Sequence, residues 1–321
     1  MNDFDFSNIE KAYKIIKDDV IRTPLITNEY INNQVKGKVF FKLENLQKTG
    51  SFKLRGAYHK ISKLNETQKQ RGVVAFSSGN HAQAVAYASY KKNISAIIIM
   101  PNNAPKIKIE NTKKYNAKVI LYNPEQEIRE SLAEEIAFNE KKTIIKPYDD
   151  FDIIAGQGTA GKEIAEELES NSIIPDIYLC CCGGGGLIAG TSTYLKYKFP
   201  NIEVYAVEPD EFDDTKTSLE TGSIKRNKAN SFSICDALLA PQPGSITFPI
   251  NKENLIGGLT VSDNDVKKII PFLAKHLKIV SEPGGAVAAT AALLGKINIK
   301  NKNIVVMISG GNIDLEMFKT L

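Results

Sequence analysis

The segment KTGSFKLRGA, residues 48–57, contains a lysine in a setting that suits chemistry. Lys53 stands between Phe52 and Leu54 at the predicted start of a helix. Apolar surroundings and the positive end of a helix both disfavour the ammonium form of a lysine. A free amine at this position can attack an aldehyde or remove a proton from carbon. Most lysines are solvated surface charges, so the case for Lys53 depends on the motifs that accompany it.

Two glycine-rich motifs are candidates for binding a phosphate group. The first, GQGTAG at residues 156–161, matches the dinucleotide fingerprint, and we predict that it opens a helix. A nicotinamide enzyme also needs an acidic residue at the end of the next strand to bind the ribose. That strand, IYLCCC, ends instead in Cys182 and four glycines, and the segment DDFDII before the motif is a poor strand. We therefore do not predict dinucleotide binding.

The second motif, CCCGGGGLIAG, predicts a phosphate cradle. A buried strand leads into Gly183, Gly184, Gly185 and Gly186, and a helix is predicted from about Leu187. Several backbone N–H groups can approach one phosphate where side chains are missing, and the helix adds its positive end. The lysine and hydroxyl of a P-loop do not follow, so ATP and GTP are not expected. The phosphate would belong to a bound cofactor; the alternative is a tight turn for close helix packing.

Five motifs follow one another in order: KTGSFKLRGA, SSGNH, GQGT, CGGGGL and ISGGN. Pyridoxal phosphate requires a phosphate cradle, a lysine that forms a Schiff base and a group facing its pyridine nitrogen. The ordered set closely resembles the family of pyridoxal-phosphate serine and threonine dehydratases and serine racemases, over nearly the whole chain. The resemblance implies pyridoxal 5′-phosphate as cofactor and the two-lobed fold of type II pyridoxal-phosphate enzymes, similar to the tryptophan synthase β-subunit.

The resemblance also implies roles for individual residues. Lys53 and Ser78 would be catalytic, with Lys53 carrying the cofactor and Ser78 on the opposite face of the substrate. The residues implied around the cofactor are Phe52, Lys53, Asn80, Gly183, Gly184, Gly185, Gly186, Leu187 and Ser309. The residues implied around the substrate are Ser77, Ser78, Asn80 and His81. Ser309 would face the pyridine nitrogen, where a neutral group suits an elimination.

The acidic segment EPDEFDD, residues 208–214, resembles the divalent-cation loop of the same family. Glu208 and Asp214 would supply carboxylate oxygens, and Phe212 its backbone carbonyl. Waters would complete the oxygen shell that Mg²⁺ or Ca²⁺ prefers. The alternative is a solvated acidic turn, and we expect the metal.

Two further residues bear on specificity. Ala237 stands where members of the family often have glycine, and Gly284 where threonine or alanine is usual. Both segments are expected to border the substrate. Glu282 matches the family's acid near the cofactor, and we assign it no role.

The remaining histidines and the cysteines suggest no metal chemistry. His59 and His276 fall on polar helical stretches, so we expect them at the surface. The three cysteines at residues 180–182 alternate between the two faces of a strand and cannot converge on one metal. We expect them to be small, buried and reduced, as in a cytoplasmic protein.

The elements that must position these residues alternate along the chain. Apolar or β-branched runs such as KVFFKLE, GVVAFSS, SAIIIMP and DIYLCCC alternate with helical patterns such as HAQAVAYASYKK. This order predicts an α/β fold with parallel-rich sheets covered by helices. The sequence pattern changes near KPYDDFDIIAGQG. This change predicts a small domain, residues 72–150, inserted in a large cofactor-binding domain, residues 1–71 and 151–321.

Length and charge agree with such an architecture. The chain has 321 residues and a formal net charge of +4, with basic and acidic residues interleaved, so we expect neither nucleic acid nor membrane as a partner. The N-terminus lacks the apolar core of a secretory signal, and the longest apolar run, ISAIIIM, is too short to cross a bilayer. We expect a cytoplasmic homodimer whose small-molecule substrate is an amino acid.

The expected activity is that of a pyridoxal-phosphate-dependent ammonia-lyase, which would convert L-threonine and L-serine to 2-oxobutanoate or pyruvate. Within the family, the alternatives are a serine racemase and a 3-hydroxyaspartate dehydratase. The latter needs an additional cation for the second carboxylate, and Arg55 is the arginine within the quoted motifs. A non-catalytic amino-acid-binding protein is the alternative from another class, but it has no need of a Schiff-base lysine. Because the chain ends soon after ISGGN, we expect no regulatory domain behind the catalytic one.

Overall fold

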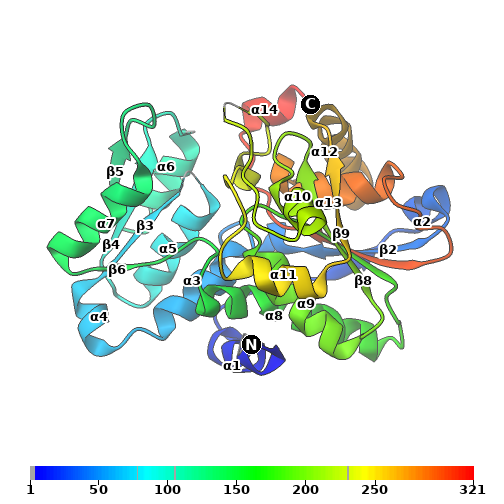
Figure 1. Ribbon diagram of the computed structural model, residues 1–321, viewed down its shortest axis with the longest axis horizontal. Coiled ribbons are helices and arrows are strands. Elements are labelled where there is room, and N and C mark those ends of the chain that lie inside the picture. Colours follow the sequence, from blue (N-terminus) through cyan, green and yellow to red (C-terminus); the bar gives the residue numbers. More distant parts are fainter. Residues whose placement is uncertain (1–3, 78, 105, 230) are drawn as a thin grey trace.

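The computed structural model describes residues 4–77, 79–104, 106–229 and 231–321. The chain forms two lobes, each built on its own sheet, with helices packed around both sheets (Figure 1). The smaller lobe, with β3 (Val73–Phe76) to β6 (Thr143–Ile144), lies at the left of the view. The predicted α/β fold with parallel-rich sheets is confirmed.

Six strands form the sheet of the large lobe, in the order β1-β2-β10-β7-β8-β9. Neighbouring strands run parallel, except that β1 is antiparallel to β2. Their bounds are β1 (Leu25–Thr27), β2 (Lys38–Leu43), β10 (Asn303–Ile308), β7 (Ile177–Cys181), β8 (Glu203–Pro209) and β9 (Gly257–Val261). Every residue of β7 is buried, as expected for a central parallel strand covered on both faces.

Four parallel strands form the sheet of the small lobe, in the order β5-β4-β3-β6. Their bounds are β5 (Lys118–Tyr122), β4 (Ala96–Pro101), β3 (Val73–Phe76) and β6 (Thr143–Ile144). All four lie within the segment that we predict as the small domain, residues 72–150. The domain boundaries themselves stay a prediction.

Helices cover both sheets and join them. Those that precede or belong to the small lobe are α1 (Phe6–Ile16), α2 (Glu29–Val35), η1 (Glu44–Leu46), α3 (Lys53–Ser62), α4 (Glu66–Arg71), α5 (Asn80–Lys91), α6 (Lys106–Lys113) and α7 (Arg129–Glu140). Those that follow it are α8 (Phe151–Ser170), α9 (Gly186–Lys198), α10 (Asp214–Thr221), η2 (Asp236–Leu238), α11 (Thr247–Asn254), α12 (Asp263–Leu277), α13 (Pro283–Leu293) and α14 (Leu315–Lys319). The strand runs quoted above form β2, β3, β4 and β7, whereas the short strands β1 and β6 and the glycine-initiated β9 were not predicted.

The prediction that GQGTAG opens a helix is wrong. The motif lies inside α8, which begins at Phe151 because the side chain of Asp150 accepts hydrogen bonds from the first backbone N–H groups. A Cβ atom on Gly156 would lie 2.6 Å from the Cα of Gly56, and one on Gly161 would lie 2.8 Å from the Cα of Thr191. These glycines therefore allow α8 to pack closely against α3 and α9.

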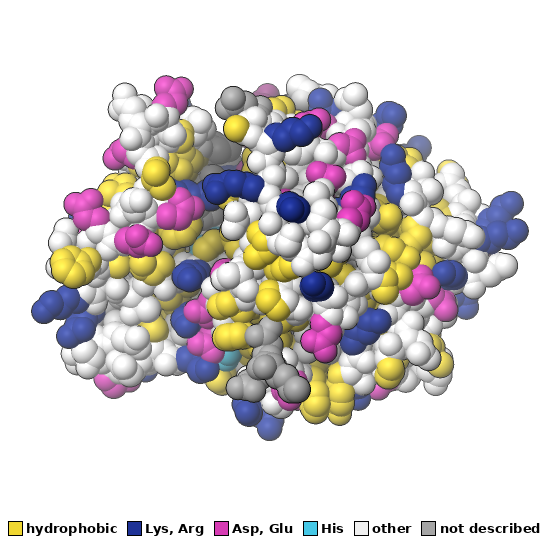
Figure 2. Space-filling view, in the orientation of Figure 1, with side chains coloured by type: hydrophobic (Ala, Val, Ile, Leu, Met, Phe, Trp, Pro, Cys, Tyr) yellow, Lys and Arg dark blue, Asp and Glu magenta, His cyan; other side chains and the backbone are white. Residues whose placement is uncertain are grey.

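Within the described part of the chain, no helix is both long and apolar enough to cross a membrane. Lysine, arginine and acidic side chains are interspersed over the face seen in Figure 2. This distribution agrees with the small net charge of the sequence.

Candidate functional site

A cavity of about 310 Å³ lies between the two lobes, at the carboxyl ends of β3, β7 and β10. Ligands of open α/β sheets bind at such positions. The predicted site residues that line this cavity are Phe52, Lys53, Ser77, Asn80, His81, Gly183, Gly184, Gly185, Gly186, Leu187 and Ser309. Ser78 lies outside the described residues. The fold thus brings segments from several distant parts of the sequence to one cavity, while the role of each residue stays a prediction.

Lys53 begins α3, and its amine lies at the wall of the cavity. The Nζ atom donates a hydrogen bond to the carbonyl of Pro147 at 2.8 Å and lies 5.1 Å from the ring centroid of Phe52. Burial lowers the pKa of Lys53 to about 8, against the opposing influence of Cys181 and Glu282. About one tenth of the amine is then unprotonated at pH 7, which suits a nucleophile or a base.

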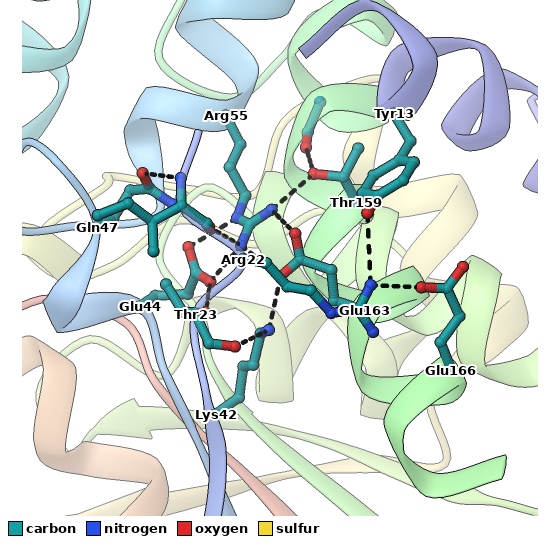
Figure 3. A network of polar contacts seen from close by, with 12 residues as sticks. Tyr13, Arg22, Thr23, Lys42, Glu44, Gln47, Arg55, Thr159, Glu163 and Glu166 are labelled. Carbon is teal, nitrogen blue, oxygen red and sulfur yellow. Dashed lines mark hydrogen bonds and ion pairs between the residues drawn. The ribbon is translucent and has the colours of Figure 1, made fainter. Parts of the chain in front are cut away.

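Arg55, on the same helix, anchors α3 in the protein interior (Figure 3). Its guanidinium donates hydrogen bonds of 2.8 Å to both carboxylate oxygens of Glu44, and of 2.8 and 2.7 Å to those of Glu163. Lys42 adds a second cation, with Nζ 2.7 Å from Glu163. All four side chains are at most 1% exposed, and their formal charges cancel. Because Arg55 is fully engaged here, it does not provide the cavity with a cation.

The four-glycine turn can accept an anion. Gly185 has a φ of +88°, in the region that favours glycine, and a Cβ atom on Gly184 would lie 2.4 Å from the ring of Tyr148. The carbonyl of Gly184 accepts a hydrogen bond from the Thr247 hydroxyl at 2.7 Å, and α9 begins at Gly186. Backbone and helix end together therefore fit the predicted phosphate cradle.

His81 is buried in its neutral form. Burial and the nearby charge of Lys53 lower the pKa of its imidazole to about 3. Its Nε2 lies 2.9 Å from the carbonyl of Ile145, so Nε2 carries the hydrogen as a donor and Nδ1 is left as an acceptor. Among the described residues, Nδ1 has no hydrogen-bond partner, so this wall of the cavity contains one unpaired buried acceptor.

Asn80 joins the two lobes at the cavity. Its amide donates to Glu282 at 2.5 Å, and its carbonyl oxygen accepts from Asn312 at 2.8 Å. Burial raises the pKa of Glu282 to about 7. The end of β10 meets α3 nearby, where the backbone N–H of Phe52 donates to the carbonyl of Ser309 at 3.1 Å.

The acidic loop lies apart from the cavity. Glu208 is fully buried, and its carboxylate accepts the backbone N–H groups of Thr215 at 2.9 Å and Lys216 at 2.8 Å. Asp214 accepts a hydrogen bond from Asn227 at 2.6 Å through one oxygen, while no described residue donates to the other. Burial raises the pKa of Asp214 to about 7, and burial together with Asp214 raises that of Glu208 well above its ordinary value.

A cation would relieve this arrangement, since two buried carboxylates and an unused oxygen are suited to a hard metal ion. Phe212, the third predicted ligand, is also buried. Over residues 4–77, 79–104, 106–229 and 231–321, no cluster of three or more His, Cys, Asp or Glu side chains is suited to a metal. Any ion here would therefore depend on backbone oxygens and water as well as on the two acids.

The expectation that His59 lies at the surface is wrong. The imidazole is 3% exposed, and its Nδ1 lies 2.7 Å from the carbonyl of Asp152. The polar pattern around His59 misled the prediction because α3 is covered by other helices, including α8 (Figure 1). His276 is half-buried and stacks on Tyr30, with the ring centroids 4.6 Å apart.

The four cysteines are buried and unpaired, as predicted for the consecutive three.

Several cavity residues were not found from the sequence. They are Phe76, Lys108, Tyr122, Arg129, Tyr148, Cys181 and Asp236. Lys108 and Arg129 lie on the helices α6 and α7 of the small lobe, where a lysine or arginine normally signals a solvated surface. Only their position opposite the large lobe distinguishes them from surface charges.

Comparisons with known proteins agree with this geometry. Residues 16–310 match the family model described as pyridoxal-phosphate dependent enzyme. A serine racemase of Schizosaccharomyces pombe is 42% identical over 98% of this chain and 95% of its own length. An L-threo-3-hydroxyaspartate ammonia-lyase of Saccharomyces cerevisiae is 37% identical over 98% and 95%. The crystal structure of a threonine deaminase from T.th. has 36% identity and a TM-score of 0.92, over 97% of this chain and 99% of the other.

Proposed function

Because the chain belongs to the family of pyridoxal-phosphate dependent enzymes, we propose that it is an ammonia-lyase acting on L-threonine and L-serine. The products would be ammonia with 2-oxobutanoate or pyruvate. The observation that carries this proposal is the convergence of a lysine of lowered pKa, a four-glycine turn and Ser309 on one cavity. A threonine deaminase is among its similar structures.

The residues of the cavity fit the cofactor. Lys53 would hold pyridoxal phosphate through its amine, the glycine turn before α9 would bind the phosphate, and Ser309 would face the pyridine nitrogen. When bound, the cofactor stabilises negative charge at the substrate's Cα once its proton has been removed. The positive φ of Gly185 and the start of α9 at Gly186 support a backbone approach to the phosphate.

The protein's own groups would then move the proton. The Nζ atom of Lys53, released from the cofactor, would take the Cα proton of an L-amino acid, and its lowered pKa allows it to act near neutral pH. Ser77 and Asn80 would donate hydrogen bonds to the substrate carboxylate, while neutral His81, whose Nδ1 is an acceptor, would line the same wall without adding a charge. The Lys53 ammonium so formed would return the proton to the β-hydroxyl, which would leave as water.

The racemase alternative depends on Ser78, which would have to donate a proton to the opposite face of the substrate. A hydroxyl is a poor proton carrier at neutral pH unless its neighbours perturb it. We therefore propose that elimination is faster than racemisation, although a serine racemase is among the relatives.

Hydroxyaspartate is the second candidate substrate, because the cavity carries an arginine outside the quoted motifs. Arg129 lines the cavity with its guanidinium carbon 5.6 Å from the ring centroid of Phe76, and its Nε donates to the exposed Glu130 at 2.8 Å. A guanidinium pairs well with a carboxylate, so Arg129 can meet the requirement of a second carboxylate. A hydroxyaspartate ammonia-lyase is among the similar proteins.

A divalent cation at Glu208, Asp214 and the carbonyl of Phe212 is also part of the proposal. Its support is the pair of buried carboxylates with raised pKa values and the unused oxygen of Asp214. The cation would be Mg²⁺ or Ca²⁺, since all ligands are oxygens.

A cytoplasmic homodimer stays a prediction, and light scattering during size-exclusion chromatography tests its assembly.

An amino-acid panel tests the proposed function. Purified protein loaded with pyridoxal phosphate should be yellow, and borohydride should fix the label on Lys53. Keto-acid release should be fastest with L-threonine and L-serine; a strong preference for 3-hydroxyaspartate, lost in Arg129→Met, would establish the second candidate instead. D-serine forming faster than pyruvate would reverse the choice between lyase and racemase.

A further inference from the structure

Lys108 is a buried cation of the small lobe whose partner belongs to the large lobe. It lies on α6, its side chain is 7% exposed, and its Nζ forms an ion pair with the carboxylate of Asp236 in η2. Both residues line the cavity. The side chain of Asp236 is 39% exposed, so the pair lies where the cavity meets solvent.

The aliphatic stem and ammonium of Lys108 also contact the loop that follows β3. A Cβ atom on Gly79 would lie 3.0 Å from Cδ and 3.2 Å from Nζ of Lys108. The neighbouring Asn80 reaches the large lobe independently, by donating to Glu282. Gly79 and Asn80 thus lie between two polar contacts that cross from one lobe to the other, Lys108–Asp236 and Asn80–Glu282.

The charges make the Lys108–Asp236 contact strongly favoured in this arrangement. An ammonium so far removed from water is costly unless it is paired. The positive charge of Lys108 also lowers the pKa of Glu282, whereas Asp236 raises it, so the two residues act on the same acid in opposite directions. Separating the lobes would leave Lys108 without its counter-ion.

We propose that Lys108 and Asp236 are positioning residues that hold the small lobe against the large lobe and thereby fix the loop around Gly79 and Asn80 for the substrate carboxylate. The role in substrate binding rests on the proposed function, whereas the contact between the lobes does not depend on it. Because the pair orders the binding loop and leaves the amine of Lys53 untouched, its loss should affect substrate binding more than turnover.

A double-mutant cycle tests this on the protein loaded with pyridoxal phosphate. Lys108→Met and Asp236→Asn should each raise KM for L-threonine about tenfold, with kcat changed less than about threefold. The double variant should be no worse than the worse single variant, because each change already breaks the pair. Lys108→Arg should restore most of the binding, and Lys113→Met, an exposed lysine on the same helix, should behave as wild type.

Amide hydrogen exchange provides a readout that needs no turnover. Both single variants should speed exchange at the start of α5 and throughout α6, measured without substrate. Unchanged exchange in both would overturn the proposal, whatever the activity. A lower KM in Asp236→Asn would also overturn it, since Lys108 would then bind substrate directly once freed. If no amino acid is turned over but exchange rises as expected, the proposed function fails while the contact between the lobes stands.

Discussion

Lys53 and Arg55 lie two residues apart on one helix, yet only the charge of Arg55 is compensated by buried neighbours. Arg55 is surrounded by matched carboxylates, and two acids and two bases cancel in the interior. Lys53 faces a cavity with His81 and lies near Glu282, and burial moves the pKa of each of these three groups toward its uncharged form. Compensated buried charges therefore stabilise the fold, whereas uncompensated buried groups are suited to binding a ligand.

The largest effect is expected from Lys53→Ala. It should lower keto-acid release from L-threonine by about 1,000-fold or more, because in the proposed function the amine both holds the cofactor and acts as the base. The variant should fold, since an uncompensated buried amine contributes little to stability. Activity and visible absorbance are the measurements, with Lys63→Ala at the half-exposed C-cap of α3 as the control. Full activity in Lys53→Ala would remove this lysine from the mechanism.

Arg55→Met should lower the stability of the fold, in contrast to Lys53→Ala, which should lower activity. Two buried carboxylates would remain with Lys42 alone, so the free energy of unfolding should fall by about 3–5 kcal/mol. Denaturant unfolding measures the change. Arg22→Met is the control, because Arg22 pairs with Glu166 at the surface and should contribute less than about 1 kcal/mol. Equal losses in the two variants would contradict the compensated role of Arg55.

Glu282 should make the stability of the cofactor-free protein depend on pH. Its pKa is about 7 in the folded state against an ordinary 4.5, so the folded state holds the proton more tightly than the unfolded chain. The resulting stability is fully present below pH 4.5 and is lost as the pH rises to about 7, by about 3 kcal/mol. Glu282→Gln should remove this slope in unfolding experiments, and the exposed Glu316→Gln should keep it. Parallel pH profiles for wild type and Glu282→Gln would contradict the assignment.

Removal of divalent cations should have the smallest of these effects. The carboxylates of Glu208 and Asp214 resemble the cavity groups in being uncompensated, and an ion at about 100 times its Kd would stabilise the protein by about 2.7 kcal/mol. Chelation should therefore lower the melting temperature, and added Mg²⁺ or Ca²⁺ should restore it. Glu208→Gln should show no response to either treatment. A wild-type protein indifferent to chelation would mean that the loop is only an acidic turn.

Sequence patterns alone determined the order of the main strands and helices and the segments that surround the cavity. Hydrophobic periodicity is local, and a lysine after an apolar residue or four consecutive glycines have few structural uses, so Lys53 and the glycine turn could be recognised. The order of the five motifs then indicated the family that the chain resembles. None of this required knowing which segments are neighbours in space.

Only the tertiary structure decided which charges are compensated. Arg55 meets Glu163 from a distant helix, Lys108 meets Asp236 from the other lobe, and His59 is covered by α8. The structure also shows that the glycines of GQGTAG, a candidate phosphate motif by sequence, allow helices to pack closely. Burial and pairing depend on residues far apart in the chain, and these long-range contacts set the free energy of a charge, which a local pattern does not contain.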